Sequence, residues 1–157
     1  KKYGDRRSQI ELFITQLEIA EKAKKPVVIH NRDAGADVLT ILADRMPEAG
    51  GILHCYSEGA EFARRALKLP LYFSFAGNLT YRNARNLHET VRALPIDRIL
   101  VESESPFIPP APHRKERNMP ANTVVTVQFM AKLLKMDAEA LAVQLWKNSC
   151  KAFNLPE

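Results

Sequence analysis

The stretch PVVIHNRDAGADVLTIL, residues 26–42, decides the fold of this chain. Its residues Val27–His30 form a short apolar run that ends in a polar side chain, which is typical of a buried strand. Asp33 can then cap a helix in which apolar residues recur at positions 38, 39, 41, 42 and 46. A buried strand followed by an amphipathic helix is the repeating unit of α/β proteins.

The same order of elements continues on both sides of this stretch. Upstream, a helix with the capping-box pair Ser8 and Glu11 leads into Pro26. Downstream, we expect strands at residues 52–56, 71–75 and 99–103, helices at 58–69, 81–94, 120–135 and 137–153, and a proline-rich loop at 106–112. Within these helices, His88 is expected at the surface and Trp146 in the packing. Short apolar strands alternating with helices predict a parallel sheet covered by helices, which suits both an open doubly wound sheet and a barrel.

Polar residues at the strand ends distinguish the two architectures. His30, His54, Glu102 and Glu104 each stand at the carboxyl end of an expected strand, where barrel enzymes build their active sites. Open sheets bind ligands at the same end, but usually through a glycine-rich phosphate loop, and the sequence has none. The pattern therefore favours an α/β fold of the TIM-like (β/α) barrel type.

The two histidines are the sharpest candidates for a shared metal ion. His30 and His54 are 24 positions apart, one strand–helix unit, which predicts that they lie on adjacent strands. Adjacent strands are ~4.8 Å apart and metal–nitrogen bonds are ~2.0–2.1 Å long, so both imidazoles can reach one cation. Two histidines with ordinary hydrogen bonds at the edge of the sheet are the alternative.

Two carboxylates follow the last expected strand. Glu102 and Glu104 are two residues apart, so they face the same way along an extended chain. A carboxylate pair at a strand end is costly unless a cation or an Arg neutralises it. We therefore expect a metal ligand or a general base here, with solvated loop carboxylates as the alternative.

Basic and polar residues near the same edge are candidates for phosphate binding. Arg32 follows the first expected strand, and Arg117 and Asn118 end the basic run at 113–118. An Arg guanidinium can hold a phosphate through two parallel hydrogen bonds. The hydroxyl of Ser57 is a further candidate. A solvated basic loop, and a plain helix N-cap at Ser57, are the alternatives.

Composition limits the class of protein. The 157 residues, 46% apolar and 26% charged, suit one soluble globular domain spanning residues 1–157. No apolar run approaches the ~18 residues of a membrane span, and no signal-peptide pattern is present, so we expect no membrane partner. Two cysteines far apart in sequence make no metal or redox motif and favour the cytoplasm. A net charge of +5 favours approach to polyphosphates, and the oligomeric state stays open.

Five segments match one set of family motifs in the right order. They are Pro26–Ala34, Leu53–Ser57, Phe73–Gly77, Leu100–Phe107 and Arg117–Ala121. These segments resemble the motifs of TatD-type metal-dependent deoxyribonucleases, and the resemblance covers nearly the whole chain. It implies a TIM-like barrel with a one- or two-metal site at its carboxyl end and hydrolysis of DNA phosphodiester bonds.

The resemblance also implies roles for individual residues. His30 and His54 would ligate a divalent ion such as Mg²⁺, Mn²⁺ or Zn²⁺, and Glu104 would ligate the metal or act as the catalytic base. Arg32, Arg117 and the neighbouring Asn118 would orient the phosphate of a DNA substrate.

Two features depart from the family pattern. The family's first-strand His-x-His and a Glu on a middle strand are expected before residue 1. We therefore expect this chain to supply about the C-terminal four strands of the barrel, with open edges at Val27–His30 and Ile99–Ser103. Glu104 stands where the family has Asp. Its side chain is roughly 1.5 Å longer, and a ~1 Å misplacement of a catalytic group can cost ~10²-fold in rate.

Three interpretations follow. The first is a metal-dependent deoxyribonuclease that acts on DNA. The alternative is a non-catalytic relative that binds nucleic acid or a protein partner, which Glu104 and the missing ligands favour. The third is a related barrel amidohydrolase that acts on another small substrate.

Overall fold

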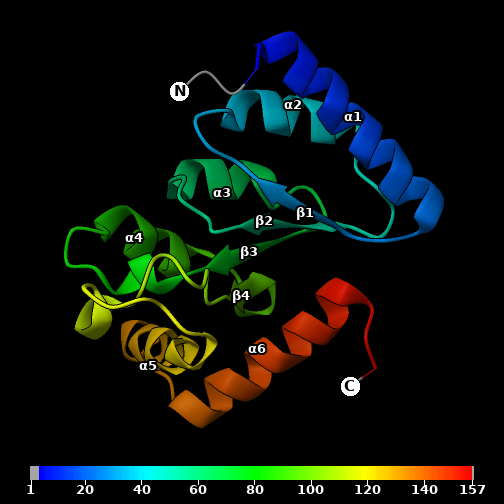
Figure 1. Cartoon of the computed structure of the whole chain (residues 1–157). Coiled ribbons are helices and arrows are strands. Elements are labelled where there is room, and N and C mark those ends of the chain that lie inside the picture. The colour runs from blue at the N-terminus through cyan, green and yellow to red at the C-terminus, as the bar shows by residue number, and fades with distance from the viewer. Residues whose placement is uncertain (1–3, 157) are drawn as a thin grey trace.

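The computed structural model describes residues 4–156 and contains a four-stranded parallel sheet in the order β1-β2-β3-β4 (Figure 1). The strands are β1 (Val27–His30), β2 (Gly51–His54), β3 (Leu71–Phe75) and β4 (Ile99–Val101). Each strand pairs in parallel with the next one along the chain, as in consecutive units of a barrel wall. The predicted α/β barrel-type arrangement is confirmed. Within residues 4–156, β1 and β4 are the edge strands, as expected.

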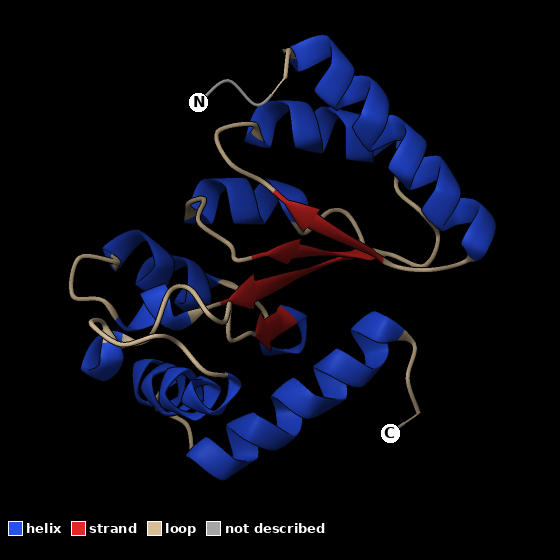
Figure 2. Cartoon of the chain, viewed as in Figure 1, coloured by secondary structure: helices blue, strands red, loops and turns tan. Residues whose placement is uncertain are grey.

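Helices alternate with these strands and lie around the sheet (Figure 2). They are α1 (Arg6–Ala23), α2 (Gly35–Arg45), α3 (Ala60–Ala66), α4 (Arg85–Ala93), α5 (Thr123–Leu134) and α6 (Ala138–Phe153), with the 3-10 turns η1 (Gly77–Thr80), η2 (Ile96–Arg98), η3 (Ala111–His113) and η4 (Pro120–Asn122). None of the described helices is both long and apolar enough to cross a lipid bilayer.

The two faces of the sheet bury different residues, because side chains alternate along a strand. One face joins the main core against the helices, through residues such as Leu53 and Phe73. The other face carries Ile52 and Leu100, which pack with Ala152 of α6 in a small second cluster. Alternation places the two strand-end histidines on this second face as well, since each lies two residues beyond Val28 or Ile52.

The helix starts differ from the expected caps. Asp5, rather than Ser8, caps α1: its carboxylate accepts a hydrogen bond from the Ser8 backbone N–H at 3.0 Å. Asp33 does not cap α2, because its φ of 58° places it in the left-handed region, whereas an N-cap is extended. The residue before α2 is Ala34, which makes no side-chain capping bond.

Several elements are shorter than predicted. β2 ends at His54 instead of residue 56, since Cys55 adopts a φ of 43°. β4 ends at Val101 instead of residue 103. The helix expected from residue 58 begins at Ala60, and the one expected from residue 81 begins at Arg85.

Two side chains are placed against expectation. Trp146 is 62% exposed, because α6 buries a different face, which includes Leu141 and Leu145. His88 was expected at the surface but is half-buried. Its Nε2 lies 2.8 Å from the Leu79 carbonyl oxygen, and its ring packs against Phe129.

Candidate metal centre

The two strand-end histidines lie side by side. His30 and His54 are the last residues of β1 and β2 and are paired in the sheet register. Their ring centroids are 5.8 Å apart. The predicted approach of the two imidazoles on adjacent strands is confirmed. His30 is exposed, whereas His54 is half-buried deeper in the sheet.

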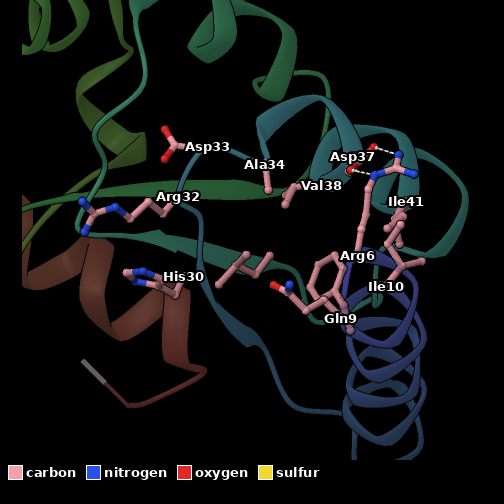
Figure 3. A pocket seen from close by; sticks show the side chains of 12 residues that line it. Arg6, Gln9, Ile10, His30, Arg32, Asp33, Ala34, Asp37, Val38 and Ile41 are labelled. Atoms are coloured by element: carbon pink, nitrogen blue, oxygen red, sulfur yellow. Dashed lines mark hydrogen bonds and ion pairs between the residues drawn. The ribbon is translucent and has the colours of Figure 1, made fainter. Parts of the chain in front are cut away.

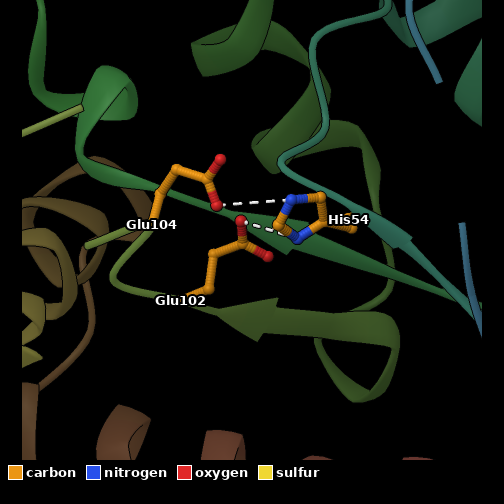
Figure 4. A group of neighbouring side chains, drawn as sticks. All are labelled: His54, Glu102 and Glu104. Carbon is orange, nitrogen blue, oxygen red and sulfur yellow. Dashed lines mark ion pairs between the residues drawn. The ribbon is translucent and has the colours of Figure 1, made fainter. Parts of the chain in front are cut away.

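Two carboxylates converge on His54 from the end of β4 (Figure 4). Nδ1 of His54 lies 3.1 Å from Oε1 of Glu102, and Nε2 lies 3.3 Å from Oε2 of Glu104. One ligand atom from each of the three residues lies within 4.8 Å of the other two. All three side chains are half-buried. The structure thus groups both candidate carboxylates with His54, while His30 stands beside this group of three.

The donor set fits a divalent cation. A neutral imidazole carries one N–H, so it can donate to only one carboxylate, and its other nitrogen then faces an oxygen lone pair. A cation bound to that nitrogen and to the neighbouring carboxylate would remove this repulsion. Oε1 of Glu102 is buried and makes no hydrogen bond within residues 4–156. Nitrogen and carboxylate oxygen are ordinary ligands of divalent ions at ~2.0–2.2 Å, and one such atom from each of the three residues lies within 4.8 Å of the other two.

The backbone after β4 places the two carboxylates. The Glu102 N–H donates to the Phe75 carbonyl oxygen at 3.0 Å, which continues the pairing with β3 for one more residue. Glu104 then adopts a φ of 55°. The left-handed region costs an L-residue roughly 1–2 kcal/mol, so surrounding contacts must hold Glu104 there. The two side chains reach the same imidazole through this turn and not as members of a strand.

Cys55 follows His54 and also adopts a positive φ. Its half-buried thiol has a pKa raised to about 12, mainly by burial and further by the negative charges of Glu102 and Glu104. On its own, the thiol therefore stays protonated at neutral pH. It can donate a weak hydrogen bond.

A cavity of about 510 Å³ opens beside the metal-ligand candidates. It is lined by His30, Asn31, Arg32, Asp33, Cys55, Ser57, Glu58, Asn78, Glu104 and Ile108. The structure therefore brings the predicted residues Arg32 and Ser57 to the same space as Glu104. Ser57 is not a helix cap, because Gly59 precedes α3.

Three polar residues of this cavity, Asn31, Glu58 and Asn78, were not predicted from the sequence to belong to the site. Asn31, whose amide donates to Glu58 at 3.1 Å, and Asn78 each have a buried side-chain oxygen without a hydrogen bond in the described chain. Asn31 and Glu58 do lie next to residues that were singled out. Asn78 lies in η1, and none of its neighbours in the sequence was predicted to be a site residue.

A second cavity, of about 380 Å³, lies between α1, α2 and β1 (Figure 3). Arg6 and Asp37 close one side with two hydrogen bonds of 2.8 and 2.6 Å. The hydrogen bond from Arg6 holds the pKa of the Asp37 carboxyl below its ordinary value. His30 and Arg32 lie on the opposite side of this cavity. Both residues also line the cavity beside Glu104.

The remaining two predicted residues lie apart from the cavity lining. Arg117 is exposed on the loop after η3. Asn118 is only 3% exposed, and its amide nitrogen contacts the backbone carbonyls of Ser103, Phe107 and Ile108. The side-chain polar atoms of Asn118 are thus engaged within the protein, and its predicted contact with substrate stays a prediction.

Comparison with known proteins places this geometry in context. The sequence profile described as TatD related DNase matches residues 1–154. The chain is 40% identical over 148 residues to the "Uncharacterized metal-dependent hydrolase YcfH" of Escherichia coli K12, covering 94% of this chain and 56% of the relative. It is 39% identical to the similarly described YabD of Bacillus subtilis, with 94% and 58% covered. The chain thus spans little more than half the length of these relatives.

Two solved structures share the fold. The TatD homologue YJJV of Escherichia coli matches with a TM-score of 0.91 at 24% identity, over 98% of this chain and 61% of that one. An uncharacterized amidohydrolase from Saccharomyces cerevisiae matches with a TM-score of 0.84 at 17% identity, over 96% and 61%. At these identities the likeness concerns the arrangement of strands and helices.

Proposed function

This chain belongs to the family of TatD-related DNases, and from that premise we propose that it acts as a metal-dependent hydrolase on DNA phosphodiester bonds. The observation that carries the proposal is the convergence of His54, Glu102 and Glu104 at the carboxyl end of the sheet. The buried Glu102 oxygen without a hydrogen bond supports a cation as their natural partner.

The named residues can divide the work of hydrolysis. When bound, a divalent ion supplies the positive charge that polarises a phosphoryl oxygen and makes water a stronger acid. His54 and Glu102 would hold that ion, and His30 stands beside them, with its ring centroid 5.8 Å from that of His54. Glu104 lines the cavity, where its carboxylate can ligate the ion or accept a proton from water.

Substrate binding would use the open cavity. Arg32 is exposed there and can hold a phosphate group through two hydrogen bonds. Ser57 and the protonated Cys55 can donate hydrogen bonds to phosphate oxygens from the same wall. The net charge of +5 favours encounter with a polyanion such as DNA. The two cysteines are free thiols, which supports the cytoplasm as the proposed compartment.

The test is a substrate panel with a matched variant. The protein is incubated with end-labelled single-stranded DNA, a simple phosphodiester and an amide substrate, with Mg²⁺, Mn²⁺ or Zn²⁺ and with EDTA. We expect cleavage of DNA that EDTA abolishes. His54→Ala should lose about 10²-fold or more, because even an outer-shell partner of a metal contributes ~10–100-fold.

His113→Ala is the control, since His113 pairs with Glu116 outside the ligand group. It should cleave DNA at the wild-type rate. Cleavage of the amide but not of DNA would favour the amidohydrolase interpretation. DNA binding without cleavage, in the presence of every metal, would favour the non-catalytic one.

A further inference from the structure

We propose that Asn118 is a positioning residue of the metal centre, holding the loop after β4 in the one conformation that presents Glu104 to His54. The role of the loop in catalysis rests on the proposed function, but its role in metal binding can be measured separately.

The loop after β4 is held under backbone strain. Glu104 and Ile108 adopt φ values of 55° and 48°. The left-handed region is disfavoured for any L-residue and more so for a β-branched one such as Ile108. The stretch between these two residues therefore needs contacts from outside to keep its shape.

Asn118 supplies contacts at both ends of this stretch. Its Nδ2 lies 2.5 Å from the Ser103 carbonyl oxygen, 2.7 Å from that of Phe107 and 3.3 Å from that of Ile108. An amide nitrogen has two hydrogens, so the longest of the three contacts is a shared one. The Ser103 carbonyl belongs to the peptide unit that leads into Glu104, so this bond directly restrains the strained residue.

The other polar atoms of Asn118 are also engaged. Its Oδ1 accepts from the Met119 N–H at 2.9 Å and from Nδ2 of Asn122 at 3.1 Å. Its backbone N–H donates to the Pro106 carbonyl oxygen at 3.2 Å. With these contacts and 3% exposure, Asn118 acts on the loop and not on a substrate.

Other contacts restrain the far half of the loop. Gly77 lies so close to the Ile108 carbonyl oxygen that a Cβ there would overlap it. The Tyr81 hydroxyl donates to the Pro109 carbonyl oxygen at 2.8 Å. These contacts begin at Ile108, whereas Asn118 reaches back to Ser103. Without the Asn118 amide, Glu104 keeps the turn bond from the Phe107 N–H to its carbonyl oxygen at 2.8 Å but loses the restraint on the peptide unit before it. Loss of Asn118 should therefore loosen Glu104 and move its carboxylate away from His54.

A second buried asparagine provides a matched control. Asn148 is 1% exposed, and its Nδ2 donates to the carbonyl oxygens of Ile96 and Ile99, both at 2.8 Å. Asn148 thus makes the same kind of contact at the amino end of β4, whereas Glu102 and Glu104 follow its carboxyl end. Its loss removes comparable hydrogen bonds without releasing Glu104.

The experiment compares Asn118→Ala, Asn118→Asp and Asn148→Ala. Urea unfolding without metal measures stability, and calorimetric titration with Mn²⁺ measures affinity. All three variants should unfold at lower urea concentration than the wild type. Only the Asn118 variants should bind Mn²⁺ more weakly, by about 10–100-fold, as expected for a residue that orients a metal ligand.

The milder variant Asn118→Ser retains one hydroxyl donor and serves if the others do not fold. It should show a smaller loss of Mn²⁺ affinity in the same direction. Wild-type affinity in a folded Asn118 variant, or an equal loss in Asn148→Ala, would overturn the positioning role. A wild-type protein that binds Mn²⁺ but leaves DNA intact would contradict the proposed function alone, and one that binds no Mn²⁺ would overturn both.

Discussion

The amino and carboxyl ends of the parallel strands are built in contrasting ways. At the amino end, backbone groups pair closely: the Gly51 N–H donates to the Pro70 carbonyl oxygen and the Val27 N–H donates to that of Gly50, both at 3.1 Å. Asn148 adds its two bonds to carbonyl groups near the start of β4. This end uses its polar groups for pairing within the protein.

At the carboxyl end, polar groups gather without full pairing. His54 faces two carboxylates, and the buried Oε1 of Glu102 accepts no hydrogen bond in the described chain. Cys55 and Glu104 adopt positive φ values there. The difference is the one expected if stability and ligand binding are assigned to opposite ends of the same strands, as in barrel enzymes. Substitutions at the amino end should therefore reduce stability, whereas substitutions at the carboxyl end should reduce metal binding or activity.

The largest effect is expected at Glu104. Glu104→Ala should nearly abolish DNA cleavage, because it removes a carboxylate that faces both His54 and the cavity. Glu104→Asp should retain or raise activity, since the family resemblance of the segment Leu100–Phe107 implies the shorter acid at this position. Cleavage rates are measured with Mg²⁺ and Mn²⁺. Equal rates for all three proteins would show that Glu104 is not in the site.

At the amino end, Gly51→Ala should reduce stability and spare the site. A Cβ on Gly51 would lie 2.8 Å from Cγ2 of Val27 and 2.9 Å from its carbonyl oxygen. Overpacking of this kind costs about 1–3 kcal/mol in the free energy of unfolding. Urea unfolding should show that loss, while the Mn²⁺ affinity of the folded protein stays unchanged. An unchanged stability with weaker Mn²⁺ binding would reverse the proposed division between the two ends.

The smallest effect is expected at Arg32. Arg32→Ala should raise KM for DNA by about tenfold, equivalent to ~1.4 kcal/mol, with little change in kcat. The guanidinium is exposed in the cavity and would contact the phosphate in the ground state and the transition state alike. Arg92→Ala, an exposed Arg on α4, is the control. A KM unchanged by Arg32→Ala would remove Arg32 from the phosphate site.

The sequence predicted the elements better than the turns that place the ligands. Strand Leu71–Phe75 and the pairing of His30 with His54 were predicted because apolar runs and their polar ends are local patterns. The end of β2 was missed because Cys55 and Tyr56 continue an apolar run, while the positive φ of Cys55 leaves no compositional mark.

Roles that depend on tertiary contacts were harder to predict. Asn118 ends a basic run, and only the folded loop shows that its amide faces backbone carbonyls. Trp146 was expected in the packing, yet the helix turns other residues inward. Glu102 was recognised as a candidate ligand from its position, but the burial of its Oε1 without a hydrogen bond in the described chain required the structure.

The most direct test of a metal centre at the carboxyl end is calorimetric Mn²⁺ titration of the wild type and Glu102→Gln. The glutamine keeps the shape of the side chain and removes its charge, so the fold should persist. We predict that the wild type binds Mn²⁺ and that the variant binds it at least about tenfold more weakly, because a neutral amide oxygen replaces a carboxylate ligand. Equal Mn²⁺ affinity in the two proteins would contradict the assignment of this cluster as a metal site.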